Sequence, residues 1–326
     1  MSINIIGKDE YPEHLEQFKK TVNEIFPILG FTPEQIEAFI KEFELPYDDT
    51  VYSIENALGK TVFIRTLINA YGIRSIQYVI SSTWSDRYKL VKSAIEQLKS
   101  DFIKANTEKK LFIRITEEFP SHNAYYAGLL PELGFDMEPR VIMTANQELV
   151  TQLDLTELPN NINEISFSEN RLPEFIDLYH KAYAVHQNSL LPERLAHERE
   201  FRKWQLTDAQ QQKDAVKTWV GVELNGEIVG SCYGRIWGNE MSVEELAILP
   251  EFYGKGLGRF LTIRCMQKLK EHFGEPSRYF FIGTNRTFTR ALKLYHRLGF
   301  KINSVETYAT LVNYDASDQP FGKVPL

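Results

Sequence analysis

The stretch that decides the fold is LAILPEFYGKGLGR, residues 246–259, in which an apolar strand runs through a glycine-rich turn into a helix. Glycines at the alternate positions 254, 256 and 258 let backbone amides approach an anion closely. The N-terminus of the following helix adds unpaired N–H groups and a favourable dipole. The turn therefore predicts a cradle for a pyrophosphate, although a plain helix-initiating turn explains the glycines alone equally well.

The strands before this turn form an antiparallel series. They are expected at 218–223, 228–235 and 241–249, and an Asn225-Gly226 turn joins the first two. This order disfavours a dinucleotide-binding fold, which needs alternating strands and helices. A Walker A loop is also excluded, because Arg and Phe follow the last glycine in place of Lys and Ser or Thr.

The other elements of the second half are helices alternating with short strands. Apolar residues at helical spacing predict the helices, and compact apolar runs predict the strands. The order is β-α-α-β-β-β-α-β-α-β-β, so we expect an α/β fold of the α+β kind, with helices covering a mixed sheet. The strands are expected at 162–167, 279–282, 300–306 and 308–313, and the helices at 172–184, 192–205, 256–273 and 287–298.

The first half repeats this ending in a weaker form. Leu133-Gly134-Phe135 ends a predicted helix as Leu298-Gly299-Phe300 ends its counterpart, 165 positions later (298 minus 133). The matching order of elements indicates an internal duplication. Turn formers at 158–163 place the boundary, so the two domains are expected at 1–157 and 158–326. The first half is expected to hold a hairpin at 53–67, strands at 75–81 and 111–115, and helices at 88–104 and 123–133.

Charge and cysteine content narrow the classes of function. The chain has 326 residues, and its 37 Lys and Arg against 44 Asp and Glu give a net charge of −7 without a basic block, which argues against a nucleic-acid partner. Cys232 and Cys265 form no spacing typical of a metal site and fit a reducing compartment. No apolar run reaches the ~18 residues that a membrane span requires, and no secretory leader is evident. We therefore expect a cytoplasmic protein without a metal and without a membrane partner.

The glycine-rich turn resembles the acyl-CoA loop of the GNAT superfamily of N-acetyltransferases. That loop has the pattern Arg or Gln, two residues, Gly, one residue, then Gly or Ala, and here Tyr253 stands at the Arg or Gln position. A second stretch, Ala291 to Phe300, resembles the family's fourth-helix signature Ala-x-x-x-Tyr-x-x-x-Gly-Phe. Where the family often has Asn three residues before that Ala, this sequence has Phe288.

The resemblance implies that 158–326 form a catalytic GNAT domain with acetyl-CoA as its cosubstrate. The whole chain is similar in arrangement to mycothiol synthase-like tandem acetyltransferases, which implies two GNAT-like domains. The first half has no glycine at its strand–helix junction, 80–87, and Leu130 stands where the duplication would place a tyrosine. We therefore expect 1–157 to be a degenerate GNAT-like domain without a CoA loop.

By the same resemblance, one set of residues is expected to bind acetyl-CoA. The backbone of the strand before the turn would pair with pantetheine, and the amides of the turn would hold the pyrophosphate. Lys255 and Arg259 would add positive charge beside the phosphates, and Asn285 would replace the missing Asn. The expected cofactor-binding residues are Leu246, Ala247, Ile248, Gly254, Lys255, Gly256, Leu257, Gly258, Arg259 and Asn285.

Acetyl transfer to an amine requires a base, a donor to the carbonyl oxyanion and a proton for the departing thiolate. Tyr295 matches the family tyrosine near the CoA sulfur and is the candidate general acid, although its helical spacing also fits a core aromatic. Glu244 is the preferred base. Glu245 would face the other side of a regular strand, but a bulge would bring it to the same side. Both carboxylates would equally suit a solvated surface.

Two classes of function stay open. We expect an enzyme that transfers acetyl from acetyl-CoA to a primary amine of a small molecule or peptide, by direct attack in a ternary complex. The alternative is a non-catalytic acyl-CoA-binding regulatory protein, because fold does not dictate function. Aminoacyl transfer from tRNA is disfavoured by the net charge of −7. The sequence leaves open the identity of the acceptor and whether the protein is a homodimer.

Overall fold

The structure, a computed structural model, divides into two compact units. Unit 1 comprises Met1–Ile115, Phe119–Glu138 and Tyr308–Leu326, and unit 2 comprises Thr116–Glu118 and Pro139–Thr307. The described residues are 2–6, 11–25, 27, 32–44, 50–55, 61–68, 73–81, 87–105, 110–116, 128–148, 152–187, 192–237, 240–274 and 279–312.

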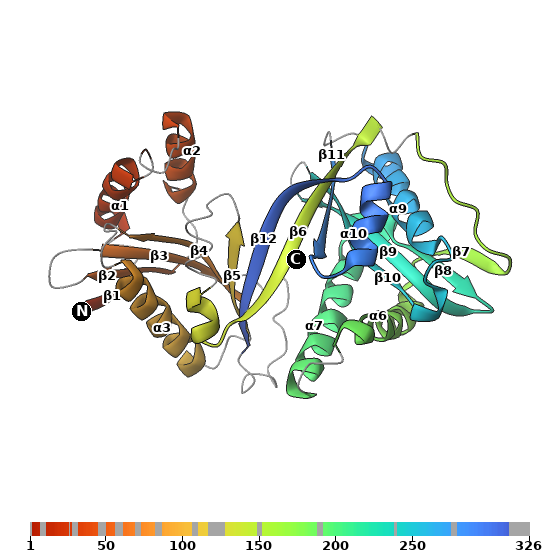
Figure 1. Cartoon of the computed structure of the whole chain (residues 1–326), viewed down its shortest axis with the longest axis horizontal. Coiled ribbons are helices and arrows are strands. Elements are labelled where there is room, and N and C mark those ends of the chain that lie inside the picture. Colours follow the sequence, from red (N-terminus) through yellow and green to blue (C-terminus); the bar gives the residue numbers. More distant parts are fainter. Residues whose placement is uncertain are drawn as a thin grey trace. The chain divides into compact units, whose positions relative to one another are not determined.

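The strands of unit 2 have the order β12-β6-β11-β10-β9-β8-β7, to which β12 contributes 301–307 and β6 contributes 139–146 (Figure 1). The neighbours from β7 to β10 are antiparallel, which confirms the predicted antiparallel series. In contrast, β10 and β11 are parallel, because helix α9 (Leu257–Phe273) connects them. The strands are β6 (Asp136–Asn146), β7 (Ile162–Ser166), β8 (Val220–Leu224), β9 (Glu227–Trp237), β10 (Glu240–Ile248), β11 (Tyr279–Asn285) and β12 (Lys301–Val312).

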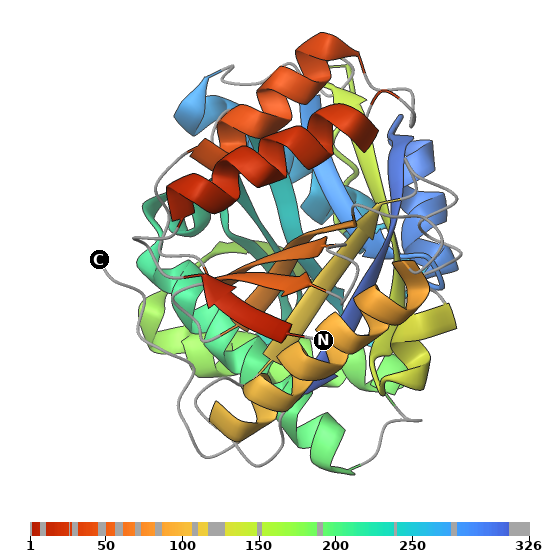
Figure 2. The ribbon, with the colours of Figure 1, turned by 90° about the vertical axis from the view of Figure 1, so that its left-hand side faces the viewer.

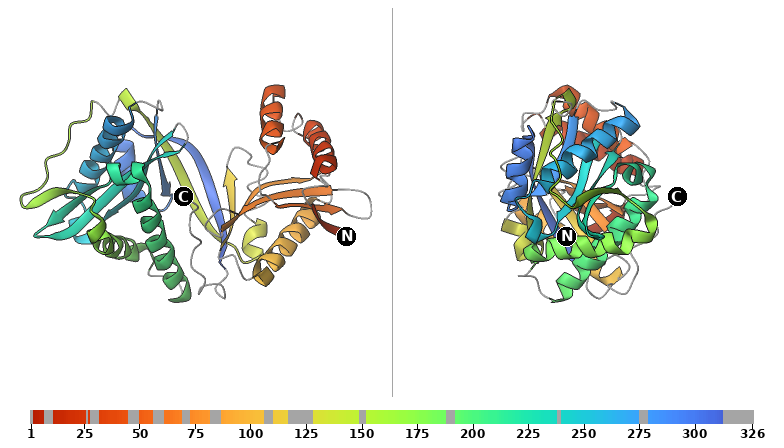
Figure 3. Two further views of the ribbon diagram at one scale, coloured as in Figure 1. Left: turned by 180° about the vertical axis from the view of Figure 1, so that it is seen from behind. Right: turned by 90° about the vertical axis from the view of Figure 1, so that its right-hand side faces the viewer.

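Helices cover both faces of this sheet (Figures 1 and 3). On one face α9 approaches closely at Gly230 and Gly234 of β9, where a Cβ would meet leucine side chains of the helix. On the other face a Cβ at Gly221 of β8 would meet Phe175 of α6. The remaining helices of the unit are α6 (Leu172–Gln187), α7 (Pro192–Gln211), α8 (Lys213–Thr218), which the sequence did not predict, and α10 (Thr289–Arg297).

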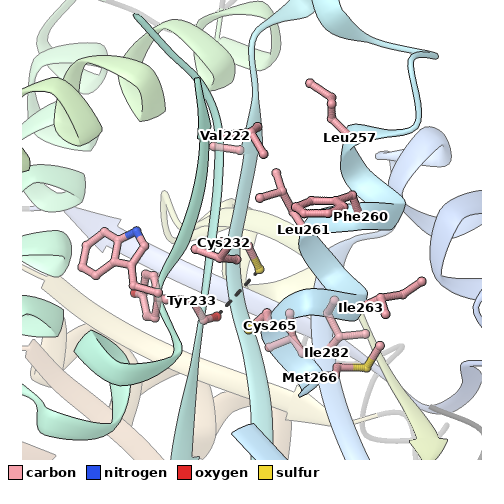
Figure 4. Packing of buried hydrophobic residues seen from close by; sticks show 14 of the residues in the cluster. Val222, Cys232, Tyr233, Leu257, Phe260, Leu261, Ile263, Cys265, Met266 and Ile282 are labelled. Carbon is pink, nitrogen blue, oxygen red and sulfur yellow. Dashed lines mark hydrogen bonds between the residues drawn. The ribbon is translucent and has the colours of Figure 1, made fainter. Parts of the chain in front are cut away.

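The core of unit 2 lies between α9 and the strands. Figure 4 shows Leu261 and Cys265 of α9 beside Val222 and Cys232 of the sheet. All four side chains are 0% exposed, and both cysteines are free thiols. The two cysteines are therefore small buried residues of this core.

Two strands of this sheet differ from the prediction. β6 comes from the first half of the sequence, and it pairs antiparallel with β11 from Arg140 opposite Asn285 to Asn146 opposite Tyr279. β12 is one continuous strand, where the sequence predicted two, at 300–306 and 308–313. The prediction of two strands was wrong because Glu-Thr-Tyr at 306–308 contains no turn former that would end a strand. The predicted division into domains at 157/158 stays a prediction.

Unit 1 has a smaller sheet with helices on both faces (Figure 2). Neighbouring strands from β1 to β4 are antiparallel, whereas β4 and β5 are parallel and are joined by α3, as α9 joins β10 and β11. The helix predicted at 123–133 is seen at 128–132, and 121–127 lie outside the described residues. The elements are β1 (Ser2–Ile6), α1 (Tyr11–Ile25), α2 (Pro33–Glu44), β2 (Thr50–Glu55), β3 (Thr61–Ile68), β4 (Ile73–Ser81), α3 (Arg87–Ala105) and β5 (Lys110–Thr116).

The close approach of α9 to β9 gives a prediction for stability. Replacing Gly234 by alanine should destabilise the protein by about 1–3 kcal/mol, because the new Cβ would lie 2.5 Å from Cδ1 of Leu269, which is itself 0% exposed. Urea unfolding measures the loss.

In a Leu269→Ala background the same replacement should cost less, because the clashing side chain is gone. Gly128→Ala is the control, since a Cβ there meets nothing within 4 Å. An equal cost of Gly234→Ala in both backgrounds would show that Leu269 does not limit this position.

Candidate active site

β10 and β11 separate part of the way along their length. They pair only through 241–243 of β10 and 280–282 of β11, although β10 continues to Ile248 and β11 to Asn285. On its other side β10 remains paired with β9 as far as Ile248. The edge of β10 that faces β11 therefore has no strand partner from Glu244 onward among the described residues. Such an edge offers backbone N–H and C=O groups to a ligand.

The glycine-rich turn follows directly after β10. Gly254 and Gly256 have φ of 80° and 83°, in the left-handed region that favours glycine. Gly256 is also the N-cap of α9, whose first amides have no partner within the helix. Gly258 has no room for a side chain, since a Cβ would lie 3.0 Å from Leu294 and 3.3 Å from Ile248. The turn thus presents mainly backbone, as a cradle for an anion requires.

The other predicted residues of the turn differ in what they can offer. Leu257 is 1% exposed, so its side chain belongs to the core and only its backbone is available. The ammonium of Lys255 lies 4.5 Å from the centre of the Phe252 ring. Arg259 donates a hydrogen bond to the carbonyl of Asp154 at 3.4 Å. Both cations therefore lie beside the turn.

A β-bulge interrupts β10 at the two candidate carboxylates. Glu244 lies opposite Tyr233 of β9, but regular pairing resumes only at Ala247. Glu245 lies within this bulge with φ of 46°, a left-handed backbone that is uncommon for a residue with a side chain. The bulge shifts the alternation of side chains along the strand. The sequence had left open whether such a bulge brings Glu245 to the same side as Glu244.

The bulge places both carboxylates on the α6 and α7 side of the sheet. Opposed side chains of an antiparallel pair share a face, and the ring of Tyr233 lies 4.9 Å from Trp219, which in turn lies 5.4 Å from Phe175 of α6. Glu244, opposite Tyr233, therefore faces these helices and accepts a hydrogen bond from Ser242 Oγ at 2.6 Å.

Side chains of α6 and α7 hold Glu245 in place. Arg202 Nη1 lies 2.5 Å from Glu245 Oε2. Gln205 Nε2 donates to Oε1 at 2.8 Å, and the Tyr183 hydroxyl donates to Oε2 at 3.3 Å. The hydroxyl of Tyr179 donates to the carbonyl of Glu245 at 2.5 Å. The side chains of Arg202 and Glu245 are 17% and 12% exposed, so the ion pair is largely removed from water.

These four partners of Glu245 were not predicted from the sequence. A weak signal existed, because Tyr179 and Tyr183 lie four residues apart, and Arg202 and Gln205 three apart, each pair on one helix face. That spacing shows that two side chains share a face, but not which strand the face packs against. The contact of these helix faces with β10 is set by the tertiary fold and not by the local sequence.

Tyr295 is buried in α10, at 4% exposure. Burial raises the pKa of its phenol, the charge of Glu245 raises it further, and Arg140 of β6 opposes the shift. The phenol therefore stays protonated at neutral pH, as a proton donor must. Its ring also lies 6.0 Å from Phe300, so Tyr295 is part of the core as well.

Asn285 ends β11 and shapes the turn into α10. Its side-chain oxygen accepts hydrogen bonds from the backbone N–H and the hydroxyl of Thr287, at 2.9 and 2.7 Å. This oxygen is therefore engaged within the protein. A contact of Asn285 with a cofactor stays a prediction.

The described part of the chain has neither a membrane-spanning helix nor a cluster of metal ligands. No helix there is long and apolar enough to cross a membrane. No group of three or more His, Cys, Asp or Glu side chains in those same segments is placed to share a metal ion.

The sequence of residues 173–300 matches the model of the acetyltransferase (GNAT) family. The matched segment contains the bulge of β10, the glycine-rich turn and Tyr295. A comparison with curated proteins finds no match.

Several solved structures share the fold. A GCN5-related N-acetyltransferase from Sphaerobacter thermophilus is 14% identical with a TM-score of 0.55, covering 87% of this chain and 88% of its own. A tandem GNAT protein from the clavulanic acid biosynthesis pathway is 10% identical with a TM-score of 0.52, covering 96% and 99%. A GCN5-related glucosamine N-acetyltransferase region of a fungal multi-domain GH3 β-N-acetylglucosaminidase is 11% identical with a TM-score of 0.56, covering 95% and 38%. The chain thus has the fold of these GNAT proteins, and the similarity in sequence to the GNAT acetyltransferase family is confined to residues 173–300.

The ion pair at the bulge gives a second prediction. Arg202→Leu should destabilise the protein by about 1–3 kcal/mol, because it leaves the largely buried carboxylate of Glu245 without its charge partner. Urea unfolding measures the change.

Adding Glu245→Gln should recover part of the loss, since the unpaired charge is then removed. Lys203→Leu is the matched control on the same helix, because its pair with Glu200 is exposed and 3.9 Å long. If Arg202→Leu cost no more than Lys203→Leu, the ion pair would not stabilise the bulge.

Proposed function

We propose that residues 158–326 form an N-acetyltransferase that moves the acetyl group of acetyl-CoA to a primary amine of a small molecule or peptide. The observation that carries this proposal is the separation of β10 from β11 just before a left-handed glycine turn. A strand edge suits the amide groups of pantetheine, and the turn suits a pyrophosphate. The free edge of β10 is followed directly by the turn, so an extended CoA molecule can contact the edge with its pantetheine and the turn with its pyrophosphate.

The residues at this place fit acetyl-CoA as a substrate. Backbone groups of Leu246, Ala247 and Ile248 would pair with pantetheine. The pyrophosphate would be held mainly by amides, because glycines have no side chain and the Leu257 side chain is buried. Asn285 would lie beside the cofactor at the end of β11, with its side-chain oxygen engaged in the turn into α10. The residues proposed for the pyrophosphate are Gly254, Lys255, Gly256, Leu257, Gly258 and Arg259.

Transfer would occur by direct attack in a ternary complex. The amine nitrogen forms a bond to the thioester carbon, the C–S bond breaks, and the electron pair of that bond leaves on sulfur. Glu244 takes the proton of the amine, directly or through water, and Tyr295 gives its proton to the sulfur. A strand amide near Ile248 would stabilise the oxyanion. Protons balance, because Glu244 gains one and Tyr295 loses one.

Glu244 is the better base of the two carboxylates. Glu245 already pairs with Arg202 and accepts hydrogen bonds from Gln205 and Tyr183, so its lone pairs are directed at the protein. We infer that Glu245 is a positioning residue, which fixes the bulge and thereby the free edge of β10.

Residues 1–157 would form a degenerate GNAT-like domain. In unit 1 the parallel strands β4 and β5, joined by α3, repeat the arrangement that carries the site in unit 2. The sequence between β4 and α3 has no glycine at 80–87, so a cradle of backbone amides is not expected there. We propose that this domain acts as a scaffold or as a dimer surface.

The cradle gives a third prediction. Gly256→Val should abolish the binding of acetyl-CoA at one site per chain in calorimetry, because valine strongly disfavours φ of 83° and its side chain would block the approach to the amides.

Gly226→Val is the matched control, since Gly226 has φ of 87° and open space around it, in the β8–β9 turn. It should carry the same backbone strain and keep binding. Tight binding by Gly256→Val would refute the cradle. Binding by the wild type without transfer to any amine would instead favour an acyl-CoA sensor.

The general acid gives a fourth prediction. Tyr295→Phe should lower kcat by more than about tenfold with little change in the affinity for acetyl-CoA, because it keeps the ring beside Phe300 and removes only the hydroxyl. The assay follows release of the CoA thiol from acetyl-CoA with a panel of amino sugars, amino acids and peptide N-termini.

The raised pKa of Tyr295 adds a pH test. Since the acid must be protonated, wild-type activity should show no alkaline loss from this group until the pH exceeds the ordinary phenol value of about 10. A loss of kcat below tenfold in Tyr295→Phe would remove the residue from the mechanism.

A further inference from the structure

Helix α10 carries a row of cations on its exposed side. Arg290, Lys293 and Arg297 follow at spacings of three and four residues, which places them on one face of the helix, and all three are exposed. The helix sequence TRALKLYHR contains no acidic residue. The opposite face supplies Tyr295 to the core. A hollow lined by Leu292, Lys293, His296 and Arg297 lies along the same helix.

Arg290 joins this row to the glycine-rich turn. Its guanidinium carbon lies 4.9 Å from the centre of the Tyr253 ring, and Tyr253 comes directly before Gly254. Within the described part of the chain, no carboxylate forms an ion pair with Arg290. A stacked guanidinium uses its flat face on the ring, so its N–H donors at the edge stay available to an anion.

The position of Tyr253 makes this contact specific to the turn. The ring of Tyr253 lets Arg290 of α10 stack beside Gly254, the first glycine of the turn. The charge of Arg290 is thus separate from the amides of α9, which are already suited to a pyrophosphate. A CoA molecule carries one more phosphate group, on the 3′ position of its ribose.

We propose that Arg290, held on Tyr253, binds the 3′-phosphate of CoA and lets the protein distinguish CoA from dephospho-CoA. This inference rests on the proposed acetyl-CoA site. Lys293, one turn further along α10, adds positive charge behind Arg290. Tyr253 is the positioning residue, because its ring fixes where the guanidinium lies.

The test compares the affinities of acetyl-CoA and acetyl-dephospho-CoA by calorimetry. Wild type should bind the dephospho form about tenfold or more weakly, the effect of losing one charge-assisted contact to a phosphate. In Arg290→Gln the ratio of the two dissociation constants should fall close to one, through weaker binding of acetyl-CoA alone. Lys213→Gln, an exposed cation at the start of α8, is the control and should keep the wild-type ratio.

The platform is tested with two variants of Tyr253. Tyr253→Phe keeps the ring and should keep the ratio, whereas Tyr253→Ala removes it and should lower the ratio as Arg290→Gln does. A ratio that Tyr253→Ala leaves unchanged would remove Tyr253 from the proposal.

Three outcomes would overturn the 3′-phosphate site. In the first, wild type binds both compounds equally. In the second, Arg290→Gln weakens the binding of both compounds by the same factor, which would place Arg290 at the pyrophosphate. In the third, Arg290→Gln leaves both affinities as they are in wild type. Each of these leaves the cradle intact, because Gly256→Val would still lose binding. If wild type bound neither compound, the proposed function itself would fail together with this site.

Discussion

The constraint on which the site depends is that β10 must leave β11 after three paired residues while it stays paired with β9. A straight, fully paired β10 would use its backbone groups inside the sheet and would have no edge to offer. The separation at Val243 and Ile282 frees that edge, and the left-handed turn at Gly254 and Gly256 then begins α9 where the free edge ends. Strand edge and helix N-terminus therefore lie in series, and a ligand with amide groups at one end and phosphates at the other matches both.

The bulge that accompanies this separation is held from outside the sheet. Glu245 adopts a left-handed backbone that a residue with a side chain rarely adopts, and such strain persists only where the surroundings impose it. Here Tyr179 holds the carbonyl of Glu245, and Arg202 and Gln205 hold its carboxylate. Helices α6 and α7 thus act on β10 through one residue. Any substitution that releases Glu245 would affect the strand edge as well as local stability, so packing and function are linked at this position.

The sequence predicted the local features of the site and missed the long-range ones. The turn and the helix after it follow from spacing within about twenty residues, where glycine conformation and helical period act directly. Tyr295 was predicted from the resemblance of Ala291 to Phe300 to the family's fourth-helix signature. The insertion of β6 beside β11 joins residues near 140 to residues near 285, and no local pattern specifies that pairing. The four partners of Glu245 were missed for the same reason, since they come from helices 40 to 66 residues before it.

The net charge of −7 and the proposed polyanionic substrate are compatible because charge acts locally. On an acidic surface a free lysine or arginine pairs readily with a carboxylate, which would neutralise it. Beside the turn, Lys255 lies on Phe252 and Arg290 lies on Tyr253, so aromatic rings hold both cations without neutralising their charge. The aromatic residues therefore hold the cations in place before a phosphate binds, and the glycine conformations hold the backbone amides in place. Less conformational entropy is then lost on binding.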